Sequence, residues 1–212
     1  MRVIPAFVLL CALVSVTPSI AHSQPTNAAR TYPLDSMSRE ISARGKMRCP
    51  KVKMLRYSGE ILRYHKPVWV YEGFLPHLKR MEKIVRDTAI EFYKRAPVKI
   101  RHMGTFNCRR IRSFPKLLSE HGIGNAIDVA GFDFAKAKGD GTPNPFSRPF
   151  RIRLQKHWNG KQGAAKVHAA FLREVIRRLK KADVFRVMLG PSYPGHKDHF
   201  HFDLAPYRLI HI

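Results

Sequence analysis

Two long amphipathic segments, separated by short strand-like runs, set the fold class of this chain. Apolar residues recur every three or four positions over residues 75–95 and again over residues 162–182, which predicts two helices. Short apolar or alternating runs over residues 98–101, 126–134, 185–189 and 199–204 predict strands. Because these elements do not follow a strict strand–helix–strand order, the sequence predicts an α+β fold.

The remaining segments are expected to connect these elements. Residues 114–124 are predicted to be a loop or a helix end. Residues 136–156 are predicted to be a long connection, because they contain Gly139, Gly141, Pro143, Pro145 and Pro149. Residues 22–45 are polar without a sustained apolar period, so we expect a flexible arm there. The folded part is expected to begin near Met47, and a single domain is predicted over residues 46–212.

The N-terminus has the pattern of a cleavable signal peptide, predicted over residues 1–21. Arg2 precedes an uncharged apolar run over residues 3–16, and Ser19 and Ala21 supply the small residues that a signal peptidase recognises. The run is shorter than the ~20 residues that a membrane span needs. We therefore expect export from the cytoplasm, with no transmembrane span after cleavage.

Export bears on the three cysteines of the chain. Cys11 lies in the predicted signal peptide, which leaves Cys49 and Cys108. An even number of cysteines in an oxidising compartment favours a disulfide, and neither residue has the CxxC spacing of a redox or zinc-ribbon site. Closing a loop of this length would stabilise the fold by about 4 kcal/mol.

Positive charge dominates the composition and indicates an anionic partner. The chain has 39 Lys and Arg residues against 15 Asp and Glu, a net charge of +24 that falls by one when Arg2 leaves with the signal peptide. Such a charge attracts an anionic polymer or an anionic lipid surface. Nucleic acid is disfavoured, because no zinc-finger, helix-turn-helix or aromatic RNA-binding motif accompanies the charge.

Histidines near the C-terminus carry the clearest chemical signal. His199 and His201 are two positions apart on a predicted strand and therefore project from one face. Phe200 and Phe202 alternate with them and are expected to point into the core. Two imidazoles side by side form half of a metal site.

Upstream residues can complete such a site. His121 precedes a turn that contains glycine, and Asp128 lies on the following strand, facing opposite to Ile127 and Val129. Two imidazoles and one carboxylate are a ligand set typical of catalytic zinc, with the fourth position left for water. A closed structural site would need a fourth protein ligand, usually with thiolates. The ligand chemistry therefore favours hydrolysis over a structural role.

Three segments resemble the bacterial extensin-like protein family and its C-terminal domain, a metallopeptidase relative. They are FNCRR (residues 106–110), SEHGIGNAIDVAGF (residues 119–132) and VMLGPSYPGHKDHFHFDL (residues 187–204). The second is also similar to the S-x-H-x-x-G-x-A-x-D motif of D-Ala-D-Ala carboxypeptidases, and the third to the H-x-x-H-x-H end of murein endopeptidases. The resemblance implies a single metallopeptidase-like domain with a small antiparallel sheet flanked by helices.

The resemblance also implies which residues act. By motif position, His121, Asp128 and His201 would bind Zn²⁺, and His199 would be the catalytic histidine beside the metal. The implied activity is that of a periplasmic zinc metallopeptidase that cleaves peptide bonds of peptidoglycan. The alternative is a non-catalytic envelope-binding protein that retains the metal site.

Three further residues receive supporting roles from the same motifs. His196 and Asp203 would orient the imidazoles. Arg109, beside Cys108, would stabilise a developing oxyanion or bind a substrate carboxylate. A solvated side chain is the alternative for Arg109, since arginine is abundant in this chain.

Overall fold

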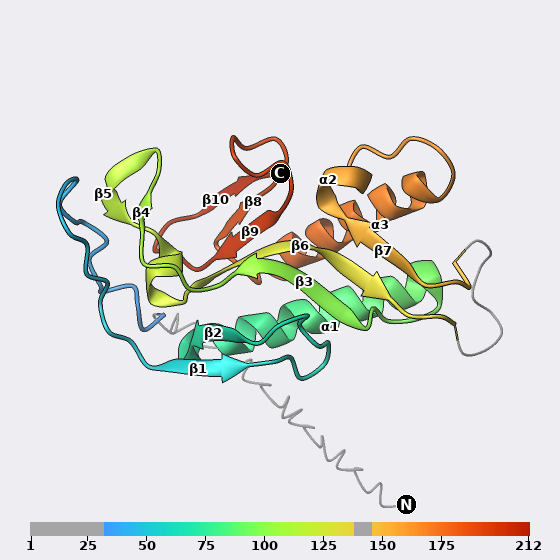
Figure 1. Cartoon of the computed structure of the whole chain (residues 1–212), viewed down its shortest axis with the longest axis horizontal. Helices are drawn as coiled ribbons and strands as arrows, with labels where there is room; N and C mark the ends of the chain where they lie inside the picture. Colours follow the sequence, from blue (N-terminus) through green and yellow to red (C-terminus); the bar gives the residue numbers. More distant parts are fainter. Residues whose placement is uncertain (1–31, 138–145) are drawn as a thin grey trace, which may run out of the picture. The chain divides into compact units, whose positions relative to one another are not determined.

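Strand β6 (Ala126–Phe134) is the centre of the main sheet in the computed structural model, which describes residues 32–137 and 146–212. The strand order is β10 (Leu209–His211), β8 (Val187–Leu189), β9 (Phe200–Asp203), β6 and β3 (Lys99–Gly104). A sixth strand, β7 (Phe150–Arg153), pairs with the second half of β6 (Figure 1). All pairs are antiparallel except β10 with β8.

The other elements lie outside this sheet. Two antiparallel pairs of strands form small separate sheets, β1 (Met54–Tyr57) with β2 (Val68–Tyr71), and β4 (Arg110–Ile111) with β5 (Phe114–Leu118). The α-helices are α1 (Leu75–Tyr93), α2 (Leu154–His157) and α3 (Gly163–Lys181). Two 3-10 helices, η1 (Glu72–Phe74) and η2 (Glu120–Ile123), precede α1 and β6 respectively.

The ends of the two long helices follow from local sequence. Helix α1 has a proline in its first turn, where no intrahelical N–H bond is lost, and ends at Lys94 in the left-handed conformation (φ 56°). Helix α3 ends with Arg178, Lys180 and Lys181 in its last turn, where cations interact favourably with the helix dipole. Arg178 also pairs with Glu91 of α1 at 2.7 Å, which ties the two helices together.

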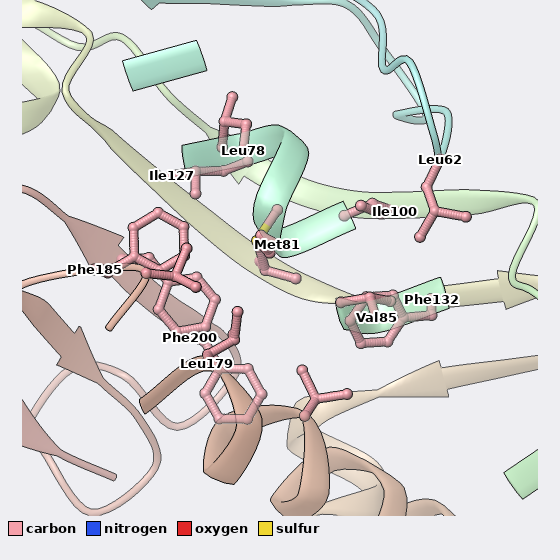
Figure 2. Close-up of a cluster of buried hydrophobic side chains, with 14 of the residues drawn as sticks. Leu62, Leu78, Met81, Val85, Ile100, Ile127, Phe132, Leu179, Phe185 and Phe200 are labelled. Atoms are coloured by element: carbon pink, nitrogen blue, oxygen red, sulfur yellow. The ribbon is translucent and has the colours of Figure 1, made fainter. Parts of the chain in front are cut away.

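A hydrophobic core joins the helices to one face of the sheet. Figure 2 shows Leu78 and Met81 of α1 beside Ile127 of β6, with Phe185 and Phe200 in the same cluster. All five side chains are almost fully buried. Because side chains alternate along a strand, the neighbours of Ile127 and Phe200 on β6 and β9 project from the other face of the sheet. The polar residues of the candidate site therefore lie on the face that the long helices leave open.

The α+β class is confirmed, and the predicted helices and strands are found within a few residues of their expected bounds. Two predicted connections are wrong. Residues 114–124 form β5 and η2 rather than a loop or helix end, and residues 150–156 contain β7 and most of α2. In β7 the alternation of Phe150 and Ile152 with two arginines lets Ile152 enter the core, and the prolines that suggested a connection all precede the strand.

The packed unit begins at Tyr32, earlier than the sequence suggested. Within the predicted arm, Leu34 and Arg39 are only 5% and 8% exposed, and the Ile41 N–H donates to the Lys116 carbonyl. Residues 32–45 therefore pack against the domain. The predicted signal peptide and residues 22–31 of the arm lie outside the described residues.

The predicted disulfide is confirmed. Cys49 and Cys108 are joined across 59 positions, with their Cα atoms 5.8 Å apart. Across the described ranges, no helix is both long and apolar enough to cross a membrane.

Candidate metal centre

Three side chains, two from one segment and one from a distant segment of the chain, converge on the open face of the sheet. Asp128 on β6 lies directly opposite His201 on β9, and His121 comes from η2, just before β6. Asp128 Oδ1 is 2.9 Å from His201 Nδ1 and 3.2 Å from His121 Nε2, and the two nitrogens are 3.2 Å apart. The structure thus brings together the three ligands that the sequence predicted, as a group able to hold a metal ion.

The hydrogen bonds behind the two rings decide which nitrogen is free. His121 Nδ1 donates to the Thr105 carbonyl at 3.1 Å, and His201 Nε2 donates to Asp203 Oδ2 at 2.6 Å. Each neutral ring then has its lone pair on the nitrogen that faces Asp128. Three acceptor atoms so close together repel one another unless a cation or a proton lies between them.

The spacing fits a divalent transition metal. Ligand bonds of about 2.0 Å at tetrahedral angles place ligand atoms about 3.3 Å apart. The observed separations of 2.9–3.2 Å are close to this value. Imidazole nitrogen with carboxylate oxygen is also a donor set that Zn²⁺ accepts, and a carboxylate behind a histidine ligand is its usual support. The residues present therefore fit the ion that the sequence suggested.

The pKa values of His201 and Asp128 show which groups carry charge when a proton takes the place of the cation. Burial lowers the pKa of His201, but hydrogen bonds to Asp128 and Asp203 outweigh burial and raise that pKa to about 10. Burial raises the pKa of Asp128, but the bonds and charges of His121 and His201 lower it well below its ordinary value. The pocket is therefore built to stabilise a positive charge, and metal binding would displace a proton.

His199 lies at the edge of this group. Its Nε2 is 3.6 Å from Asp128 Oδ1, and its Nδ1 donates to Asp198 Oδ1 at 2.8 Å. Asp198 therefore fixes the tautomer of His199, with the lone pair of Nε2 toward the centre. The His199 side chain is 12% exposed, so a solvent-borne substrate can reach it.

A model of the family described as Extensin-like protein C-terminus matches residues 43–211. The chain belongs to this family. No curated protein and no solved structure matches it. The family that the sequence motifs suggested is thus confirmed, and the centre lies wholly within the matched part of this extensin-like domain.

A tight turn positions His121 in the extensin-like domain. Gly124 ends η2 with φ 63°, and a Cβ there would lie 2.5 Å from Met54 Cε and 2.9 Å from the Tyr71 nitrogen. A Cβ on Gly122 would lie 2.9 Å from Cys49 Sγ. Glycine is therefore required at position 124, and the disulfide packs directly against the turn that carries His121.

A buried ion pair holds the same turn from the other side. Arg39 Nε donates to Glu120 Oε1 at 2.7 Å, and Asn125 Nδ2 donates to Glu120 Oε2 at 2.6 Å. Arg39 and Glu120 are 8% and 5% exposed, so the loss of either would leave a buried charge without its partner. Glu120 thus points away from the centre and serves the turn rather than the chemistry.

The other predicted residues lie at different distances from the centre. Asp203 is in direct contact with His201 and also accepts from the Ala205 N–H. The His196 ring is 4.8 Å from that of His199 and 5.8 Å from that of His201, but its Nδ1 donates to the Pro194 carbonyl. Arg109 is exposed beside the disulfide, and its role stays a prediction.

Sequence reasoning missed three residues that support the site. Asp198 directly precedes His199, and a carboxylate beside a candidate catalytic histidine was a signal that could have been used. Thr105 acts through its backbone carbonyl, which any residue could supply. Arg39 reaches Glu120 across 81 positions, so no local pattern predicts this pair.

Proposed function

We propose that this extensin-like domain is a periplasmic, Zn²⁺-dependent peptidase that acts on the peptides of peptidoglycan. The observation that carries the proposal is the convergence of three lone-pair atoms, from His121, Asp128 and His201, within 3.2 Å of one another. The remaining nitrogen of each ring is hydrogen-bonded, so both are held in the tautomer that a metal ligand needs. Three protein ligands leave one position open, which is the pattern of catalytic zinc.

A cation held by these residues would act as a Lewis acid and lower the pKa of a water molecule toward 7. Amide hydrolysis also requires that a proton leave the attacking water and reach the departing nitrogen. His199 Nε2 carries the free lone pair at the edge of the centre and can accept that proton, then donate it to the departing nitrogen. Asp198 holds the ring in position and stabilises it while it is charged.

The proposed substrate and compartment have independent support. A net charge of +24 attracts a polymer rich in carboxylates, and peptidoglycan stems carry them. The Cys49–Cys108 disulfide is typical of an oxidising compartment, and the predicted signal peptide over residues 1–21 would deliver the chain there.

The first test is metal content together with turnover. We expect protein purified without chelators to contain about one zinc per chain and to release shorter stem peptides from purified muropeptides, detected by mass spectrometry. His199→Gln should lose at least about 100-fold in turnover while its zinc content is unchanged. The matched control is His211→Gln, because His211 is an exposed histidine on β10.

The outcome also decides between catalysis and binding. If the wild-type protein holds zinc but leaves muropeptides intact, the peptidase proposal fails and a non-catalytic envelope-binding role takes its place. If the protein holds no metal and shows no turnover, both the metal centre and the hydrolysis are contradicted.

A further inference from the structure

A groove of about 450 Å³ lies beside the candidate centre, within the range of about 300–1,000 Å³ that small ligands occupy. Two of its lining residues connect it to the chemistry. Asp198 is the hydrogen-bond partner of His199, and Ala130 lies two positions after Asp128 on β6, on the same face of the strand. The full lining is Met103, Ala130, Arg153, Gln155, Lys156 and Asp198.

The wall formed by β7 and α2 is strongly basic. Asp133 is a single carboxylate shared by three guanidinium groups, Arg101 at 2.8 Å, Arg153 at 3.1 Å and Arg151 at 3.9 Å. One negative charge cannot neutralise three positive ones, so an excess of positive charge remains around Arg153, the member of this cluster that lines the groove. Lys156 adds a further exposed ammonium group at the groove itself.

Asp198 is the acidic group among the lining residues; its Oδ1 accepts the hydrogen bond of His199, and its side chain is 46% exposed. The two cationic lining residues, Arg153 and Lys156, outnumber this single carboxylate. Met103 and Ala130 supply the apolar part of the lining, and Met103 is 57% exposed. The groove thus combines a small apolar surface with two cationic side chains, beside the carboxylate that holds His199.

We propose that this groove binds the part of a peptide substrate that bears a free carboxylate, with Lys156 as the specificity-determining residue. The inference rests on the proposed function and adds the substrate class: a short peptide with small aliphatic side chains and an ionised carboxylate close to the scissile amide. Ala130 and Met103 contact the aliphatic side chains, and the ammonium of Lys156 pairs with the carboxylate. Gln155 offers an amide that can hydrogen-bond the peptide backbone.

Lys156 is the residue to change, because it tests charge without disturbing the fold. Arg153 is bonded to Asp133, so its loss would alter a half-buried cluster as well as the groove. Lys156 is exposed, and glutamine keeps most of its length. Lys181, the exposed last residue of α3, does not line the groove and provides a control with the same change in net charge.

The experiment compares two ligands that differ in one charge, acetyl-D-Ala-D-Ala and its C-terminal carboxamide. Binding is measured by calorimetry on the chelator-treated full chain, so that no turnover is needed. We expect the wild-type protein and Lys181→Gln to bind the carboxylate about fivefold tighter than the amide. Lys156→Gln should bind both equally, and Lys156→Glu should prefer the amide.

Several results would overturn the proposal. Equal affinity of the wild-type protein for the two peptides would do so, as would a carboxylate preference that survives in Lys156→Gln. Inorganic phosphate serves as a third probe. If it competes with the peptide, and if its binding is weakened equally in Lys156→Gln and Lys181→Gln, the attraction is a general effect of net charge.

Failure of this proposal is distinguishable from failure of the proposed function. Carboxylate selection that depends on Lys156, in a protein without muropeptide turnover, contradicts the peptidase but leaves the groove assignment standing. Turnover of muropeptides without any carboxylate preference contradicts the groove assignment but leaves the peptidase proposal standing.

Discussion

His201 and His168 are buried to nearly the same extent, with 8% and 5% of their surfaces exposed. Their surroundings nevertheless shift their pKa values in opposite directions. At His201, the bonds to Asp128 and Asp203 overcome burial and raise the pKa to about 10. At His168, burial and the nearby charge of His157 lower the pKa to about 4. Its ring stacks on Phe150.

The difference shows that partners, rather than burial, decide what a buried histidine does. Carboxylates around His201 prepare a place for positive charge, which a metal ion can fill. Aromatic rings around His168, with the Tyr93 hydroxyl 2.9 Å from its Nδ1, keep that imidazole neutral and part of the core. One region is therefore expected to control metal affinity and the other to control stability.

The largest effect expected is from Asp128→Asn, which removes the carboxylate that both imidazoles face. Zinc affinity should fall by about 10³-fold or more, beyond the ~10–100-fold typical of residues that only support a ligand. Competition with a chromophoric chelator measures this. Asp183→Asn is the control, because Asp183 is exposed and pairs only with a surface arginine. Unchanged affinity in Asp128→Asn would remove Asp128 from the ligand set.

His168→Ala should lower the stability of the fold rather than the affinity for zinc. It deletes a buried ring that contacts Phe146, Phe150 and His157, so the free energy of unfolding should fall by about 3 kcal/mol. Zinc affinity should stay within about twofold of the wild-type value. Urea denaturation of the chelated protein measures the first quantity and metal titration the second. A large loss of zinc affinity would mean that the two regions are not independent.

The pH dependence of stability gives a third test. Because the pKa of His168 is about 4 in the folded state and about 6.5 when unfolded, the unfolded chain binds more protons between these values. The contribution of neutral His168 is complete above pH 6.5 and is lost as pH falls through 4, by up to about 3 kcal/mol. His168→Phe should remove this part of the acid dependence, measured as the difference between the two urea-unfolding curves. Identical curves would show that His168 does not control it.

The smallest effect is expected for Asp203, which supports the candidate ligand His201. Asp203→Asn keeps the shape of the side chain but weakens the bond to His201 Nε2, so zinc affinity should fall by about 10–100-fold. The loss should therefore be smaller than that of Asp128→Asn. A loss as large as that of Asp128→Asn would place Asp203 among the ligands instead.

The faces of the candidate residues on β6 and β9 were predictable because strands impose a period of two. His199 and His201 alternate with Phe200 and Phe202, which are both 2% exposed, and Asp128 alternates with buried Ile127 and Val129 on β6. In each strand the core residues fix the face of the polar ones. The pairing of β6 with β9 then brings Asp128 and His201 together. His121 lies on η2, outside both strands, and only the motif resemblance assigned it to the same group.

Other features had no such local signal. Strand β10 has three residues and β1 has four, which is too few for a clear period. Strand β7 followed a run of glycine and proline that suggested a connection. The groove depends on Met103 of β3, Arg153 of β7 and Asp198 before β9, residues that only the tertiary structure brings together.

The contact between the disulfide and Gly122 has a consequence for when the metal centre can form. Cys49 Sγ lies where a side chain on Gly122 would be, one residue from His121. Oxidation of the two thiols therefore restrains the turn that presents a ligand, and maturation of the centre is tied to the redox history of the chain. A precursor that still holds both thiols should bind zinc more weakly, and metal titration with and without reductant can measure this difference.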